Sequence, residues 1–91
     1  MSVKFKLSDV NKGAISGRPE FVEVEGGTVG ACFKDLITKY PELERYIYDY
    51  PGEMTAALLI LHNGLSISHE EMDRPVKDGD EIFSMVIIGG G

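Results

Sequence analysis

The hydrophobic pattern of this chain changes its period at one place, and that change constrains the fold more than any other feature. Before Thr28, apolar and charged side chains alternate in the runs 3–7 and 20–25, which is typical of strands with one buried and one solvated face. After Thr28 the apolar residues fall three or four positions apart, as on an amphipathic helix: Val29, Cys32, Phe33, Leu36, Ile37 and Tyr40. The sequence therefore predicts a hairpin with a long connection, followed by a helix.

Two residues mark the ends of the predicted helix. Thr28 can cap its N-terminus, because a threonine hydroxyl accepts a hydrogen bond from the free amides of the first turn. Pro41 disfavours a helical conformation at Tyr40, so the helix is expected to end there. Residues 42–48 predict another short helical turn, with Leu43, Tyr46 and Ile47 as its apolar side chains.

The second half of the chain has the pattern of three strands. Residues 57–62 are apolar, as in a buried strand, and Asn63-Gly64 is a turn signal before a brief strand at 65–67. A polar loop is expected over 68–73 and a last strand over 81–88. A helix with one apolar stripe and strands with one apolar face pack most simply as a sheet across a helix, which predicts a two-layer α+β fold.

Length and composition indicate one small globular domain. The 91 residues are expected to form a single domain over 1–88, followed by a flexible tail at 89–91. Its 43% hydrophobic and 26% charged residues are ordinary for a globular protein, and no run approaches the ~20 apolar residues of a membrane span. Cys32 is the only cysteine, which excludes an intrachain disulfide and, with no signal-like N-terminus, favours the cytoplasm.

The charge balance bears on possible partners. Fifteen acidic residues against nine basic ones give a net charge of -6, and no Lys/Arg cluster offers the counterion release on which nucleic-acid binding depends. We therefore expect no nucleic-acid and no membrane partner, and a basic protein surface is the more natural complement. Six carboxylates could steer such a partner or simply form a solvated face: Glu20, Glu23, Glu25, Asp78, Asp80 and Glu81.

The sequence ends in three glycines, Gly89, Gly90 and Gly91, directly after an apolar strand. Without Cβ atoms such a tail is thin and sterically open, so its terminal carboxylate could enter a narrow active site of another protein. A frayed end or a cloning remnant explains a terminal glycine run equally well on spacing alone.

Five segments stand in a fixed order along the chain: Val22-Glu-Val-Glu-Gly-Gly-Thr-Val29, Thr38-Lys-Tyr-Pro-Glu-Leu43, His62-Asn-Gly64, Val76-Lys-Asp-Gly-Asp-Glu-Ile82 and the Gly-Gly end. Together they resemble the ubiquitin-like sulfur carriers of the MoaD/ThiS type, most of all the small subunit of molybdopterin synthase. The resemblance covers nearly the whole chain and implies a β-grasp fold, in which a mixed sheet packs on one main helix. The chain departs from the family at Val86-Ile87-Ile88, where many relatives carry proline.

In that family an ATP-dependent adenylating enzyme, of the ubiquitin-activating type, activates the terminal glycine, and sulfur transfer then gives a thiocarboxylate. By position, Gly91 would carry the thiocarboxylate, Gly90 would be the second tail glycine and Gly89 would fill the small-residue place before them. The resemblance implies a carrier that is not itself an enzyme and binds no cofactor, since the activating partner uses the ATP. A second partner would be the larger catalytic subunit of a sulfur-transfer enzyme such as molybdopterin synthase.

The last predicted strand is apolar on both parities, with Phe83, Met85 and Ile87 on one and Ile82, Ser84 and Val86 on the other. One face is expected to enter the core against Phe33 and Leu36, and the other to stay exposed beside the tail as a docking surface unless loops cover it. The predicted partner-binding residues are Phe83, Met85, Ile87, Ile88, Leu59 and Leu61.

Other functions stay open at this point. The same tail could serve a ubiquitin-like protein modifier whose Gly91 is linked to target lysines, or an interaction domain could carry an inert tail. A sulfur carrier could also act in thiamine or sulfur-containing amino acid synthesis. Side-chain chemistry is a weaker prediction: Cys32 falls on the apolar stripe, His62 and His69 belong to no Cys/His cluster that predicts a metal site, and no glycine-rich nucleotide-binding motif is present.

Overall fold

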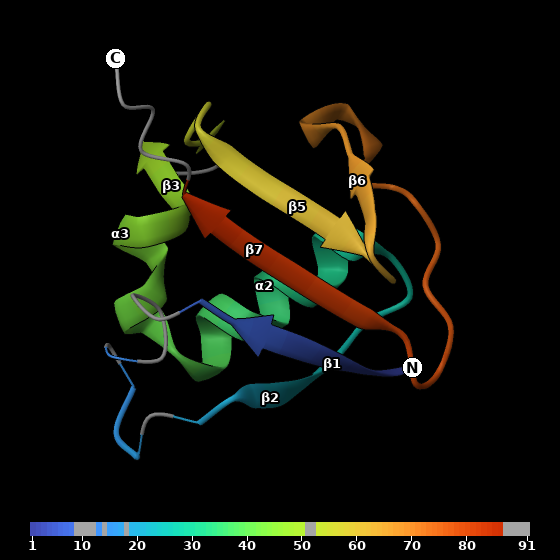
Figure 1. The fold of residues 1–91 in the computed structure, drawn as a ribbon, viewed down its shortest axis with the longest axis horizontal. Coiled ribbons are helices and arrows are strands. Elements are labelled where there is room, and N and C mark those ends of the chain that lie inside the picture. The colour runs from blue at the N-terminus through green and yellow to red at the C-terminus, as the bar shows by residue number, and fades with distance from the viewer. Residues whose placement is uncertain (9–12, 14, 18, 51–52, 87–91) are drawn as a thin grey trace.

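In the computed structural model, a sheet of five strands lies across one main helix (Figure 1). The structure describes residues 1–8, 13, 15–17, 19–50 and 53–86. The helix is α2 (Val29–Lys39), and the strands of the sheet are β1 (Ser2–Leu7), β2 (Phe21–Glu25), β5 (Leu58–His62), β6 (Leu65–Ile67) and β7 (Glu81–Val86). This arrangement confirms the predicted α+β fold with a mixed sheet on one helix.

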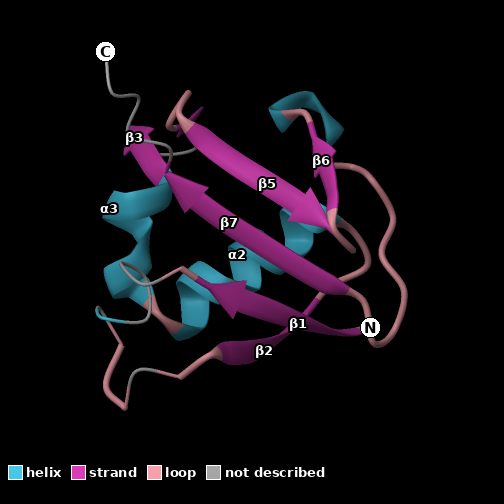
Figure 2. Ribbon diagram, viewed as in Figure 1, coloured by secondary structure: helices cyan, strands magenta, loops and turns pink. Residues whose placement is uncertain are grey.

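β7 lies in the middle of the sheet, whose strand order is β2-β1-β7-β5-β6 (Figure 2). β1 runs parallel to β7, with Phe5 opposite Ile82, whereas β5 runs antiparallel to it, with Ile60 opposite Ser84. The outer strands close two hairpins, since β2 pairs with β1 and β6 pairs with β5. The last predicted strand is described as far as Val86, and residues 87–88 lie outside the described part of the chain.

The core fills the space between the sheet and α2. The inward side chains of β1 and β2 are buried, as their alternation predicts: Val3, Phe5, Leu7, Val22 and Val24. α2 meets them with four buried residues of its apolar stripe: Val29, Cys32, Phe33 and Leu36. The ring of Phe33 packs edge-to-face on the ring of Phe5, with 5.0 Å between the centroids. A pair of aromatic rings, one from α2 and one from β1, therefore joins the helix to the sheet.

The predicted boundaries of the helix are confirmed. The Oγ1 atom of Thr28 accepts a hydrogen bond of 3.1 Å from the N–H of Ala31, and the helix ends at Lys39. Pro41 begins the 3-10 turn η1 (Pro41–Leu43), which continues into the short helix α3 (Glu44–Ile47). The predicted second helical turn is therefore present, and it buries Leu43 and Ile47 completely. Within the described part of the chain, no helix has the length and apolar content needed to cross a membrane.

Two short features were not predicted from the sequence. β3 (Tyr48–Tyr50) and β4 (Glu53–Met54) pair as a small hairpin where no strand was expected, because two or three residues are too few to show a period. η2 (His69–Glu71) lies within the predicted polar loop. It is held by a capping box, in which Ser68 Oγ accepts from the N–H of Glu70 and Glu71 Oε2 accepts from the N–H of Ser68.

The first turn of α2 is fixed by the segment that precedes β7. The N–H of Val29 donates to the carbonyl of Arg74 at 2.9 Å, and the N–H of Gly30 donates to the carbonyl of Met72 at 2.8 Å. Two amides that the start of a helix leaves free are thus paired with backbone. A Cβ atom at Gly30 would lie 2.9 Å from the Met72 oxygen, closer than real Cβ atoms approach, so this contact requires glycine.

We expect Gly30→Ala to lower the free energy of unfolding by about 1–3 kcal/mol, although alanine is the better helix former by about 1 kcal/mol. The added methyl group must displace the Met72 carbonyl and break its hydrogen bond. The matched control is Gly27→Ala, since nothing lies within 4 Å of a Cβ built there. This control should leave stability unchanged or raise it by up to about 1 kcal/mol. Urea denaturation measures both variants, and equal stability would contradict the close approach.

Candidate functional site

The outer face of the sheet carries a cluster of apolar side chains along β5 and β7. Leu59 and Leu61 of β5 lie opposite Met85 and Phe83 of β7 in the sheet register. Leu59, Leu61 and Phe83 are partly buried, and Met85 is 36% exposed. In Figure 1 the sheet lies in front of α2, so this face points toward the viewer. We call these four residues the sheet patch.

The structure thus brings together four of the six predicted partner-binding residues. The other two, Ile87 and Ile88, lie outside the described residues, as do Gly89, Gly90 and Gly91 of the tail. Of the two apolar parities of β7, the one with Ile82 and Ser84 enters the core, and the one with Phe83 and Met85 faces outward. Ser84 Oγ is fully buried and has no hydrogen-bond partner among the described residues.

A row of outward side chains continues from the sheet patch across β1 to β2, and the sequence did not predict it. Lys6 of β1 lies between Phe83 of β7 and Phe21 of β2 in the sheet register. Phe21 is 48% exposed, and the Nζ atom of Lys4 lies 5.1 Å from the centre of its ring, a cation–π contact. Lys6 and Glu81 line two shallow depressions of about 290 and 250 Å³, one beside the sheet patch and one beside Phe21. The sequence signal that could have revealed this row is the alternation along β2, which places Phe21 on the solvated face of the strand.

β7 leads from the sheet patch toward the glycine tail. Val86 is the last described residue and is 38% exposed. Residues 87–91 follow it in the sequence. A stretch of five residues spans at most about 18 Å when it is fully extended.

A buried histidine fixes the corner between β5 and β7. His62 is 8% exposed, its Nε2 atom lies 2.8 Å from Asp80 Oδ2, and its Nδ1 atom lies 2.9 Å from the Nε atom of Arg74. Because arginine can only donate, this network assigns the proton to Nε2, which donates to Asp80. Asn63 joins the same corner to β7: its N–H donates to the carbonyl of Glu81 at 2.8 Å, and its Oδ1 accepts from the N–H of Glu81 at 2.9 Å.

These contacts make Asp80 a structural residue. The hydrogen bond from His62, followed by that from the N–H of Lys77, lowers the pKa of the Asp80 carboxyl to about 2. Asp78 is engaged as well, since its Oδ1 atom accepts from the N–H of Ser2 at 2.8 Å. Two of the carboxylates considered for steering a partner therefore hold the fold together.

Asp80 should make the stability depend on pH in the acid range. A carboxyl with a lowered pKa in the folded state contributes stability fully above its unfolded-state pKa, and loses it as the pH falls through the folded-state value of about 2. We expect about 2 kcal/mol to be lost between about pH 4 and pH 2. Asp80→Asn keeps an acceptor for His62 but cannot ionise, so it should lack this part of the pH dependence. Urea unfolding of both proteins across this range measures the difference, and parallel curves would contradict the assignment.

Cys32 is a core residue. Its side chain is fully buried on α2, and burial raises the pKa of its thiol to about 11. A thiol of this kind is inert at neutral pH, as its place on the apolar stripe predicts. Elsewhere in the described part of the chain, no three His, Cys, Asp or Glu side chains group in a way that could hold a metal ion.

No family model matches the chain, and no curated protein matches it. Solved structures do match it. Small archaeal modifier protein 1 (SAMP1) of Methanosarcina acetivorans is 28% identical, with a TM-score of 0.80 over 99% of this chain and 96% of that one. SAMP1 of Haloferax volcanii is 24% identical, with a TM-score of 0.81 over 100% of both chains.

Two structures of complexes also share the fold. A chain of the BexX/CysO complex of Amycolatopsis orientalis is 19% identical, with a TM-score of 0.79 over 98% of this chain and 99% of that one. A chain of the complex of subunits 1 and 2 of molybdopterin-converting factor from Helicobacter pylori 26695 is 16% identical, with a TM-score of 0.62 over 100% of both. The chain therefore has the predicted ubiquitin-like β-grasp fold, which it shares with these small archaeal modifier proteins and with the matched chains of the two complexes.

Proposed function

We propose that this protein is a sulfur carrier whose terminal glycine, Gly91, is converted to a thiocarboxylate. The observation that carries the proposal is the position of the sheet patch, because the strand that presents Phe83 and Met85 is also the strand that leads into the glycine tail. A partner bound to the patch is thereby placed to receive the tail. The protein acts in this proposal as a substrate and subunit of other enzymes.

The chemistry takes place on the activating partner. There the carboxylate of Gly91 attacks the α-phosphate of ATP, which forms an acyl-adenylate and releases pyrophosphate. A sulfur nucleophile, supplied as sulfide or a persulfide, then displaces AMP from the carbonyl carbon. Sulfide gives the thiocarboxylate directly, whereas a persulfide gives an acyl disulfide that a thiol must reduce. The tail needs to be narrow for this step, and glycine leaves its backbone open to close approach.

The acceptor we propose first is a molybdopterin precursor, held by a larger catalytic subunit of the molybdopterin-synthase type. The sequence resemblance favours this acceptor, and one structural neighbour is a chain of a complex named for molybdopterin conversion. An acceptor in thiamine or sulfur-containing amino acid synthesis is the alternative. When the larger subunit binds at the sheet patch, it holds the thiocarboxylate close to the bound precursor. The sulfur transfer then proceeds within one complex, with the two reacting groups already oriented.

The proposal is tested by the intact mass of the protein after incubation with a cognate activating enzyme, ATP and sulfide. We expect a gain equal to the replacement of one oxygen by sulfur, located in the C-terminal peptide. Deletion of Gly90 and Gly91 should abolish the gain and leave the thermal unfolding of the domain unchanged, because neither glycine contributes a side chain to the core. An unmodified terminus, with the activating enzyme proven active on another carrier, would overturn the proposal and favour an inert tail.

The role of the sheet patch has a separate test. We expect Phe83→Ala and Leu61→Ala each to raise the Kd for the larger catalytic subunit by about 10- to 100-fold, because truncation of a central apolar contact costs about 1–3 kcal/mol. The control is Leu65→Ala, since Leu65 is 56% exposed on β6 and lies outside the patch. Isothermal titration calorimetry measures the Kd values. If all three variants bind equally well, the partner does not dock on the patch.

A protein modifier is the second candidate function. It is favoured by neighbours that are named small archaeal modifier proteins, one of which is 28% identical to this chain. A lysine amine of a target protein would then attack the carbonyl carbon of the same acyl-adenylate, release AMP and a proton, and form an isopeptide bond with Gly91. Mass spectrometry of cell lysate distinguishes the two: lysine-linked C-terminal peptides support the modifier, and abundant thiocarboxylate without such adducts supports the carrier.

A further inference from the structure

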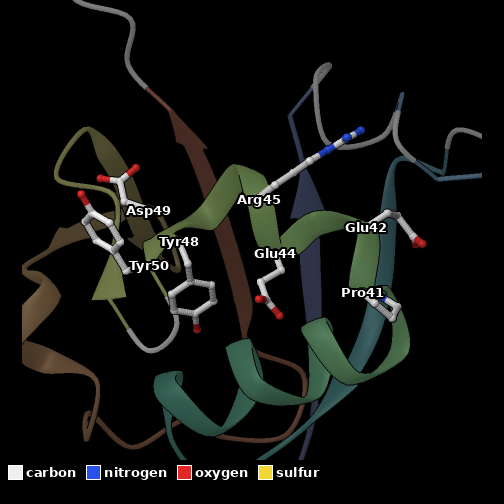
Figure 3. A pocket seen from close by; sticks show the side chains of 7 residues that line it. All are labelled: Pro41, Glu42, Glu44, Arg45, Tyr48, Asp49 and Tyr50. Atoms are coloured by element: carbon white, nitrogen blue, oxygen red, sulfur yellow. The ribbon is translucent and has the colours of Figure 1, made fainter.

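The helical side of the molecule carries a groove that the proposed function does not use. One half is an open pocket of about 530 Å³ around α3 and β3, with Glu42, Glu44, Asp49, Tyr48 and Tyr50 among its walls (Figure 3). The other half is a hollow of about 780 Å³ that shares Tyr48 and reaches α2 and η2. We call the two halves together the helical groove.

The pocket half of the groove is negatively charged. Glu42, Glu44 and Asp49 have no basic partner among the residues that the structure describes. Arg45 is the only basic residue in the walls of the pocket, and it is engaged elsewhere, since its guanidinium donates to the hydroxyl of Tyr46 at 3.2 Å and lies 5.0 Å from the centre of that ring. In Figure 3 its side chain points away from the carboxylates. The charge of the pocket is therefore uncompensated within the described structure.

The other half of the groove is mainly apolar, although Lys34 and His69 also line it. Ala31, Met54 and Met72 contribute to its walls, and both methionines are only partly buried against the core. Methionine side chains adapt their shape to what they contact, so such a surface fits varied apolar side chains. Glu53 and Asp73 add two carboxylates to this half.

Tyr48 joins the two halves, and a second tyrosine lines the pocket half. Tyr48 lines both hollows, and Tyr50 is 68% exposed beside Asp49. A lysine or arginine head group gains from the face of a tyrosine ring as well as from carboxylates. The groove therefore offers apolar contact at one end and contacts for cations at the other.

We infer that the helical groove binds a basic amphipathic segment of a partner protein. The apolar side chains of that segment would lie on Met54 and Met72, and its lysine or arginine side chains would lie at Glu42, Glu44 and Asp49. The groove lies on the side away from the sheet patch, because the sheet is in front of α2 in Figure 1, whereas α3 and β3 are in front of the sheet strands in Figure 3. Binding here leaves the sheet patch free, so the inference does not depend on the proposed function.

The test uses an 18-residue amphipathic peptide with leucine on one face and lysine and arginine on the other. Its binding to the whole ¹⁵N-labelled protein is followed by NMR and calorimetry. We expect amide shifts at residues 41–50, 53–54 and 72–73, and none along β5 and β7. A peptide with glutamate in place of its basic residues should not bind. Failure of the basic peptide to bind, or shifts centred on the sheet patch, would overturn the inference.

Two variants with the same change of net charge separate a specific site from general attraction. Glu42→Gln, Glu44→Gln and Asp49→Asn together should raise the Kd of the peptide by about tenfold or more. Glu23→Gln, Glu25→Gln and Glu70→Gln together, which lie outside the groove, should change it by less than about twofold. Thermal unfolding checks that both proteins are folded. Equal weakening by the two sets would show attraction to the net charge alone and overturn the inference.

Discussion

β7 has a paired strand on each side, and the position of every other element depends on that pairing. Lys4 to Leu7 of β1 run beside Glu81 to Ser84, and β5 covers the other edge from Leu58 to His62. A parallel pair needs a long crossover connection, which here contains α2 and the other elements between the two strands. Because β7 cannot move without breaking two ladders, the side chains of Phe83 and Met85 keep a fixed place on the outer face. The chain then leaves the centre of the sheet toward its terminal glycines.

Polar contacts hold the corner between β5 and β7. His62, Asp80 and Arg74 join the end of β5 to the start of β7, and each of the two ring nitrogens of the histidine has a partner. The backbone of Met72 and Arg74 also pairs with the first turn of α2. A buried polar group without a partner costs about 1–3 kcal/mol, so these contacts favour one geometry of the corner over looser ones. The segment that supports the helix is thus the same segment that positions the central strand.

Most of the architecture was predictable from the sequence, because its determinants are local. The change of period at Thr28 and the proline at position 41 define α2, and alternation defines the buried faces of β1 and β2. The predicted docking residues Phe83 and Met85 do lie on the outward parity of β7, although both parities are apolar and only the burial of Ser84 and Ile82 distinguishes them. The row from Phe83 through Lys6 to Phe21 depends on strand order, and the His62–Asp80 contact joins residues 18 apart. Such non-local contacts leave no periodic signal in the sequence.

The two sides of the molecule differ in how far their charged side chains compensate one another, and the net charge of the chain does not show this. On the outer sheet face Lys4 lies opposite Glu23 and Glu81, so charges of both signs stand beside the apolar side chains, whereas the pocket half of the helical groove gathers carboxylates with its only arginine turned away. A net charge of -6 suggests one uniform preference for basic partners, but the sheet patch selects chiefly by apolar area. At the groove, charge determines which partner binds. Salt screens this attraction only in part, because the Debye length of about 10 Å at moderate salt exceeds the spacing of neighbouring side chains. Two partners of different chemistry can therefore be recognised by a domain of this size without competing for one surface.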